Sequence, residues 1–260
     1  MIPEIVLGAI RIPTFFLVIS LSLSILLVFL SKRVDQFGKS RTHAFNLALI
    51  LMAAGFIGGR LMHVFYEDWA YYRADLVQIL FFWNGGFVFY GGMLACLAAA
   101  WLYVKFQKLN FFEWADFFTP LLSLSHALGR VGCLLAGCCY GSMCLLPWAL
   151  DNRHPTALYL IGGELIIFAY VRWCERAVIK GSAKIPPRGQ LFIKWVFLHS
   201  LLRFEVEYFR DDFRGHFFTL PAFGSISISQ MICLIFMMLA IVYFIVSSEW
   251  LKKLYIRPPS

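Results

Sequence analysis

The sequence predicts an all-α integral membrane protein of about seven transmembrane helices, with the N-terminus outside the cytoplasm and the C-terminus inside it. Hydrophobic residues make up 60% of the 260 residues and charged residues only 15%, whereas soluble domains carry about 25% charged residues. Apolar runs long enough to cross a bilayer recur along the chain, and basic residues gather in alternate loops between them. The net charge of +8 therefore indicates an orientation in a membrane, and we expect no nucleic-acid partner.

Seven apolar runs are the expected spans, because about 20 apolar residues cross the hydrocarbon core of a bilayer. In chain order they cover residues 12–30, 45–65, 87–103, 114–135, 157–171, 191–209 and 226–246. The first, third, fifth and seventh runs each end at basic residues, which mark the return to the headgroup layer. Charged residues interrupt the second run at Arg60, the fourth at Arg130 and the sixth at Arg203. The connecting segments are short and no internal repeat is present, so we expect a single transmembrane domain over residues 1–260.

Basic residues fall on the two sides of the predicted spans in unequal numbers. One set of loops holds Lys32, Arg33, Lys39, Arg41, Lys105, Lys108, Arg172, Arg176, Lys180, Lys184, Arg188, Lys252, Lys253 and Arg257. The opposite loops hold mainly Arg73, Arg153 and Arg214. By the positive-inside rule the first set faces the cytoplasm, and an odd number of spans then places the N-terminus on the other side.

Arg130 and Arg203 lie within predicted spans, where insertion scales put the cost of an arginine near about +2.5 to +3.5 kcal/mol. Snorkelling to the headgroups is an alternative for arginines near span ends, such as Arg60 and Arg210. Two cations that converge in the outer half of a membrane need an anion between them, and the abundant anion there is a lipid phosphate. Because a guanidinium offers paired donors to phosphate oxygens, we predict that Arg130 and Arg203 bind a phospholipid headgroup.

Arg203, Glu207 and Arg210 follow an R-x3-E-x2-R spacing, which places all three on one face of a helix. Glu207 can therefore pair with either arginine and hold it in place. A charge network that only ties this helix to its neighbours is the structural alternative.

Two glycine-rich strings, residues 83–92 (WNGGFVFYGG) and 129–141 (GRVGCLLAGCCYG), predict irregular backbone at membrane depth. Glycine allows sharp turns and the close approach of a ligand. Such backbone is tolerated where protein or a cavity covers it. Small-residue packing between helices is the alternative.

In these strings and charges the chain resembles the bacterial prolipoprotein diacylglyceryl transferase family. The matching residues are Gly59-Arg60 with Tyr66, the W-x-GG-x3-Y-GG run, Gly129-Arg130-x-Gly132 through Gly141, Arg153-His154-Pro155-Thr156 before Tyr159, Arg203-Phe204-x2-Glu207-x2-Arg210, and Ser229-Gln230. They extend from the second to the seventh predicted span, so the resemblance covers most of the chain.

The resemblance implies an enzyme that takes the diacylglyceryl group from phosphatidylglycerol and attaches it as a thioether to the lipobox cysteine of a prolipoprotein signal peptide. Glycerol phosphate is released. It also implies a multi-pass protein of the bacterial inner (plasma) membrane, with a periplasmic N-terminus, a site near the outer surface, and no metal or organic cofactor. Arginines on the phosphate would stabilise charge as the C–O bond breaks. The acceptor thiol has to lose its proton, because the thiolate is the nucleophile.

Carried over by position, Arg130 and Arg203 match the family's two essential arginines and are the expected catalytic cations. Glu207 and Arg210 match their partners, and Arg60 matches an arginine of the second span. With the glycines of the two strings, the expected substrate-binding set is Arg60, Glu207, Arg210, Gly91, Gly92, Gly132 and Gly141.

Several positions depart from the family's pattern. Typical members have His-Gly-Gly where this chain has Tyr90-Gly91-Gly92, and that histidine is a proposed general base. Typical members also have Asn, Asn and Glu where this chain has Cys133, Ala136 and Cys138. A tyrosine hydroxyl, with an ordinary pKa near about 10, is a weak base at neutral pH unless nearby cations lower it.

These departures leave two accounts of the function open. In the first, the reaction is unchanged and Tyr90 orients the lipid or relays a proton. In the second, a diverged relative binds phosphatidylglycerol or transfers a lipid-derived group to another acceptor. His126 lies four residues before Arg130, on the same helix face, and is a further candidate base; His199 lies four before Arg203. A transporter would predict paired repeats, which the sequence lacks.

Cys133, Cys138, Cys139 and Cys144 allow several interpretations. The vicinal pair Cys138-Cys139 does not fit the paired spacing typical of zinc sites, so we expect no metal. A reversible disulfide, small apolar packing residues and a nucleophilic thiolate beside Arg130 are the alternatives.

Overall fold

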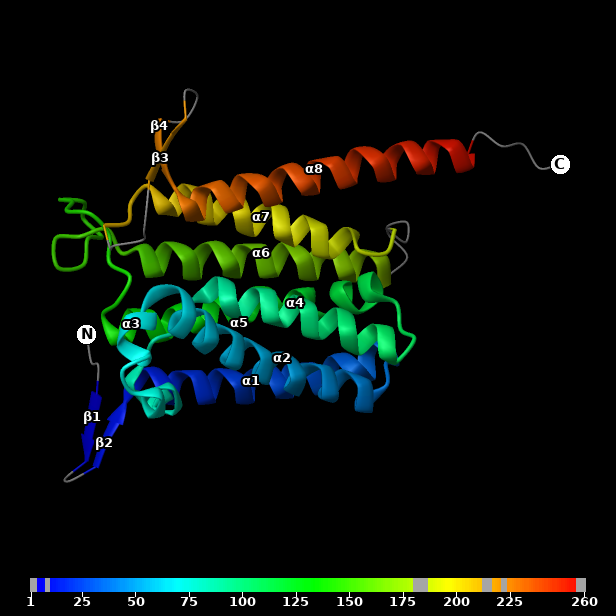
Figure 1. The fold of residues 1–260 in the computed structure, drawn as a ribbon. Helices are drawn as coiled ribbons and strands as arrows, with labels where there is room; N and C mark the ends of the chain where they lie inside the picture. Colours follow the sequence, from blue (N-terminus) through cyan, green and yellow to red (C-terminus); the bar gives the residue numbers. More distant parts are fainter. Residues whose placement is uncertain (1–3, 8–9, 180–186, 212–216, 221–223, 256–260) are drawn as a thin grey trace. The chain divides into compact units, whose positions relative to one another are not determined.

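The computed structural model describes residues 4–7, 10–179, 187–211, 217–220 and 224–255, and these residues are mostly helical, as predicted (Figure 1). They form two compact units, one of Leu27–Trp114 and one of Met1–Leu26 together with Ala115–Ser260. We call them the Leu27–Trp114 unit and the Ala115 unit and describe each by itself. The single transmembrane domain stays a prediction.

The helices are α1 Thr14–Phe37, α2 Arg41–Met62, α3 Trp69–Tyr72, α4 Phe89–Phe106, α5 Phe111–Ala136, α6 Thr156–Ile179, α7 Gln190–Glu207 and α8 Ile228–Tyr255. Two short antiparallel hairpins accompany them, β1 Glu4–Leu7 with β2 Ile10–Pro13, and β3 Phe217–Leu220 with β4 Gly224–Ser227. Neither hairpin was predicted from the sequence. The first span therefore begins after β2, and the last begins after β4.

Six of these helices, α1, α2, α4, α5, α6 and α8, are long and apolar enough to cross a membrane among the residues that the structure describes. Large apolar side chains on them are exposed, for example Ile166 at 72% and Met238 at 66%, as lipid-facing residues are. The multi-pass prediction is therefore confirmed. The seventh span and the orientation stay predictions, and Lys180, Lys184, Arg214 and Arg257 lie outside the described residues.

The seventh expected span, α7, is not among the six apolar helices because it carries Lys194, Arg203, Glu205 and Glu207. It packs against both α6 and α8, so neighbouring helices cover part of its surface (Figure 1). Its first turn is held by a carboxylate of α5: Asp116 accepts hydrogen bonds from the backbone N–H groups of Gly189 at 2.6 Å and Phe192 at 2.8 Å. A carboxylate there accepts hydrogen bonds from N–H groups that have no partner within the helix. Its negative charge also interacts favourably with the positive N-terminal end of the helix dipole.

In the Leu27–Trp114 unit, α2 and α4 pack through glycines. A Cβ added to Gly91 would lie 2.2 Å from Met62 Cβ and 2.4 Å from Gly58 O, and one added to Gly92 would lie 2.8 Å from Gly55 O. Both glycines belong to the helical first turn of α4, so the prediction of irregular backbone was wrong for them. It was right for the preceding segment, where Gly85 and Gly86 have φ of +85° and +78°. Gly91 and Gly92 thus allow two helices to pack closely, and their place in the substrate-binding set stays a prediction.

Replacing Gly91 with alanine should destabilise the protein by about 1–3 kcal/mol, the usual cost of overpacking. The reason is that the new methyl group would have to displace α2 from α4. Gly162→Ala in α6 is the matched control, because a Cβ there meets nothing within 4 Å. Thermal unfolding of both variants in detergent measures the difference, and an unchanged midpoint for Gly91→Ala would contradict this packing.

Candidate functional site

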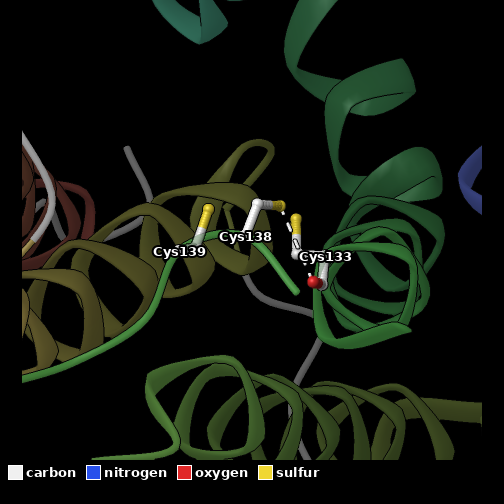
Figure 2. Close-up of side chains that lie close together, drawn as sticks. All are labelled: Cys133, Cys138 and Cys139. Carbon is white, nitrogen blue, oxygen red and sulfur yellow. Dashed lines mark hydrogen bonds between the residues drawn. The ribbon is translucent and has the colours of Figure 1, made fainter. Parts of the chain in front are cut away.

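Three cysteines gather at the end of α5 (Figure 2). Cys133 lies in the last turns of the helix, and Cys138 and Cys139 follow it. Their Sγ atoms all lie within 4.8 Å of one another, and the Cys138 thiol donates a hydrogen bond to Cys133 O at 3.6 Å. The chain turns here at Gly137, which has φ +73°, a conformation that commonly ends helices at glycine. Local backbone geometry therefore brings the three thiols together.

Arg130 lies beside this cysteine cluster. Its Nη1 atom is 3.9 Å from Cys133 Sγ and 3.7 Å from Cys139 Sγ. Hydrogen bonds with the thiols of Cys133 and Cys138, together with the charges of Arg210 and Arg130, outweigh burial and hold the pKa of Cys139 well below its ordinary value. The hydrogen bonds with the other two thiols raise the pKa of Cys138.

The segment after the cysteines is tied to the end of α7. The backbone N–H of Gly141 donates to His154 O at 3.1 Å, that of Ser142 donates to Phe209 O at 2.8 Å, and Gly141 pairs with Arg210 in an isolated bridge. A Cβ on Gly141 would lie 2.5 Å from His154 O and 2.6 Å from Phe209 O. Gly141 therefore serves backbone packing and brings the Arg210 backbone to this loop. Gly132, the remaining predicted glycine, is buried within α5.

Arg203 is held by a network that reaches α8. Its Nη2 atom lies 2.9 Å from Glu207 Oε2, and the two side chains are 16% and 1% exposed. The predicted pairing of Glu207 with an arginine of its own helix is thus confirmed. Glu207 Oε1 accepts a hydrogen bond from Ser227 Oγ at 2.9 Å, and Gln230 Oε1 accepts one from the backbone N–H of Ser227 at 3.0 Å. This network fixes the orientation of the guanidinium.

Two histidines of the Ala115 unit lie against each other. The rings of His126 and His199 have centroids 4.5 Å apart, and His126 interacts electrostatically with both Arg130 and Arg203. His199 Nδ1 is paired with Glu164 Oε1. Both arginines thus act on the same imidazole, and their binding of one shared headgroup stays a prediction.

Glu164 was missed by the sequence analysis, although it lies within an otherwise apolar run. It is 1% exposed, and Ser123 Oγ donates to its Oε2 at 2.8 Å. The signal was available, because a carboxylate inside a span is costly unless it has a partner. Glu164 holds the His199 imidazole and thereby positions the histidine pair.

A cavity of about 270 Å³ opens beside the cysteine cluster. Its lining includes Cys138, Cys139, Arg153, His154 and Thr156, so the Arg-His-Pro-Thr string noted in the sequence lies at this site. Arg153 Nη1 donates to Gly141 O and to Asp211 Oδ2, each at 3.1 Å.

Arg60 and Tyr90 belong to the other unit, Leu27–Trp114. Arg60 is 6% exposed and donates to five backbone carbonyl groups, those of Gln78, Ile79, Phe81, Gly85 and Gly86. These bonds indicate that Arg60 holds the loop in place. The resemblance had instead implied that Arg60 contacts the substrate. Tyr90 is half-buried in the first turn of α4. Its role in orienting the lipid or relaying a proton stays a prediction.

Two clusters in the described part of the chain have the ligand types of a metal site: the three cysteines, and His126 with Glu164 and His199. In the second cluster one carboxylate and two neutral imidazoles would leave a divalent ion with a net charge of +1, and Arg130 and Arg203 both act on His126, so the cluster is a poor cation site. Three thiolates, in contrast, carry more negative charge than the ion neutralises. Only the cysteine cluster combines soft ligands with an adjoining cavity.

Comparisons with known proteins give one consistent result. The sequence model of the family described as prolipoprotein diacylglyceryl transferase matches residues 4–246. Three relatives bear the name phosphatidylglycerol–prolipoprotein diacylglyceryl transferase. That of Clostridium tetani is 29% identical over 84% of this chain and 88% of its own length. That of Nitratidesulfovibrio vulgaris is 32% identical over 71% and 70%, and that of Dechloromonas aromatica is 36% identical over 62% and 63%.

Proposed function

The chain belongs to the prolipoprotein diacylglyceryl transferase family, and on that premise we propose that it is a phosphatidylglycerol-dependent transferase. It moves the diacylglyceryl group to the lipobox cysteine of a prolipoprotein signal peptide and releases glycerol phosphate. The observation that carries this proposal is the position of His126, which interacts with Arg130 and with Arg203. Two guanidinium groups that act on one imidazole suit an anionic headgroup whose phosphate leaves.

The same proposal includes the finer topology. The protein spans the bacterial inner membrane seven times, with a periplasmic N-terminus and a cytoplasmic C-terminus. Support comes from the packing of α7 against α6 and α8 and from the unequal distribution of basic residues between the loops. The partners are phosphatidylglycerol and other membrane lipid and the prolipoprotein, with no nucleic acid.

In the reaction, Arg130 and Arg203 bind the phosphate and stabilise the negative charge that grows on the leaving oxygen. The acceptor thiol gives its proton to a base, and its sulfur then forms a bond to the glyceryl carbon as the C–O bond breaks. His126 is the base that we favour, because both arginines act on it and it lies beside His199, which is paired with Glu164. Tyr90 orients the lipid.

A second candidate function rests on the residues that differ from typical members. Cys133, Ala136 and Cys138 replace two amides and a carboxylate of the family pattern, so the chain has lost polar partners next to Arg130. A relative that binds phosphatidylglycerol without turnover, or that uses another acceptor, would keep the arginines and lose these groups.

The test uses purified protein in phosphatidylglycerol nanodiscs with a lipobox peptide, and mass spectrometry of the peptide. We expect a mass increase of one diacylglyceryl group, a loss of about 10²–10⁴-fold in kcat for His126→Asn, and a small effect for Tyr90→Phe. Phosphatidylethanolamine nanodiscs are the control lipid. Lipid binding without a modified peptide would favour the second candidate, and a larger loss for Tyr90→Phe would assign the base to that hydroxyl.

A further inference from the structure

The three thiols are arranged before any ligand arrives. All three Sγ atoms lie within 4.8 Å of one another, close to the ~3.8 Å edge of a tetrahedron built on Zn–S bonds of about 2.3 Å. The backbone holds them there: Cys139 has φ +60°, and Thr156 Oγ1 donates to its carbonyl oxygen at 2.5 Å. A left-handed cysteine is strained, and surroundings that fix it keep the thiols together.

Positive charge surrounds the cluster. Arg130 Nη1 contacts the Sγ atoms of Cys133 and Cys139, and Arg210 also acts on Cys139. A divalent ion with three thiolates has a net charge of −1, and a fourth thiolate makes it −2. Two guanidinium groups therefore balance the charge of a four-thiolate complex, which a membrane site requires.

The cluster has an open side. Cys138 and Cys139 line the cavity of about 270 Å³, and among the described residues no fourth His, Cys, Asp or Glu joins the group of three. Catalytic zinc sites have this composition, with three protein ligands and one position left for water or substrate. Structural zinc sites have four protein ligands.

We propose that Cys133, Cys138 and Cys139 bind a Zn²⁺ ion whose fourth ligand is the thiolate of the acceptor cysteine. This inference rests on the proposed transferase function and names how the acceptor is activated. Soft thiolates select zinc over hard cations, and a thiol that coordinates zinc is deprotonated outright. The ion thus supplies a nucleophilic sulfur in a chain that has Tyr90 where typical members of the family have a histidine.

The acceptor thiol loses its proton to His126, directly or through water, when its sulfur binds the ion. That sulfur forms the C–S bond to the glyceryl carbon of phosphatidylglycerol, and the C–O bond to phosphate breaks with its electron pair on oxygen. Glycerol phosphate leaves beside Arg130, and the neutral thioether, a weaker ligand than a thiolate, leaves the ion.

The first experiment measures the metal content of the protein. Full-length protein purified in detergent should contain one zinc per chain by elemental analysis. After chelation and addition of Co²⁺, it should show thiolate-to-cobalt charge-transfer absorption. Cys138→Ser and Cys139→Ser should lose both signals, whereas Cys144→Ser, a cysteine of the same loop outside the cluster, should retain them. Chelation of the unaltered protein provides the same information if a variant does not fold.

The second experiment tests whether the acceptor cysteine is the fourth ligand of the metal. Adding a lipobox peptide to the Co²⁺ protein should change the cobalt spectrum, and the same peptide with serine for cysteine should not. The cobalt spectrum can be recorded without turnover, so it tests the metal site separately from the proposed function. A protein that shows the cobalt signal but has no activity would contradict the transferase function and leave the metal site standing. Metal-free protein with three reactive thiols, or with two of them joined in a disulfide, would overturn the zinc site.

Discussion

Arg130→Ala and Arg203→Ala should each lower kcat/KM for peptide lipidation by at least about 10²–10³-fold, the effect of removing one donor that stabilises a transition-state oxyanion. In the proposed function these two arginines share one headgroup phosphate, so either variant removes one of its two guanidinium contacts. The leaving group gains charge as the C–O bond breaks, and the loss should therefore fall mainly on kcat. Lysine at either position should restore only part of the activity, because it lacks the planar fork of donors.

The controls for this result have to separate chemistry from folding. Arg203→Ala leaves Glu207, 1% exposed, without the cation 2.9 Å from it, and breaking a buried pair costs about 3–5 kcal/mol. Arg203→Ala with Glu207→Gln removes that charge and should recover stability but no activity. Arg41→Ala is the surface control, since its pair with Asp35 is more than half exposed on both sides. Turnover within threefold of the unaltered protein for Arg130→Ala would reject the two-arginine site.

Arg60→Ala should destabilise the protein by at least about 3 kcal/mol, because hydrogen bonds to a charged group contribute about 1.5–3 kcal/mol each and Arg60 makes five. Its guanidinium donates to carbonyl groups between Gln78 and Gly86 and lies 5.2 Å from the centre of the Tyr72 ring. Without the guanidinium, the carbonyl groups of the loop before α4 would lose the hydrogen bonds that hold the loop in its fold.

Thermal unfolding and limited proteolysis of the loop measure this effect, with Arg73→Ala as the exposed control. Arg60→Lys should be intermediate, because one ammonium group cannot reach all the carbonyls that Nε, Nη1 and Nη2 of Arg60 contact. A stable Arg60→Ala protein with a raised KM for phosphatidylglycerol would return Arg60 to the substrate-binding set. The two roles differ in their readout, so one variant decides between them.

The fold was largely predictable because a helix that crosses a lipid bilayer needs a long run of apolar residues. Apolar runs that cross a bilayer are visible in composition, and six were found as helices. Two features of the fold depend on contacts that composition does not show. The roles of Gly91 and Gly92 depend on partners in α2 that come much earlier in the chain, and the hairpin β3–β4 depends on local pairing in a polar loop.

The site was predictable in its cations and less so in its other groups. Arg130, Arg203 and Glu207 could be identified because charge in a span requires a reason. The same argument applied to Glu164 would have found it. The thiol cluster could not be found from ligand spacing, because the three sulfurs meet only through the turn at Gly137 and the left-handed backbone of Cys139.

Ser227 ends strand β4, and its hydroxyl is bonded to Glu207, the partner of Arg203. Hydrogen bonds therefore link the hairpin to the Arg203 guanidinium, so a change in the position of the hairpin should also change the position of the guanidinium. A genetic screen for inactive variants would recover substitutions at Ser227 alongside those at Arg203. Loss of function at a position should accordingly not be taken as proof that its side chain touches lipid.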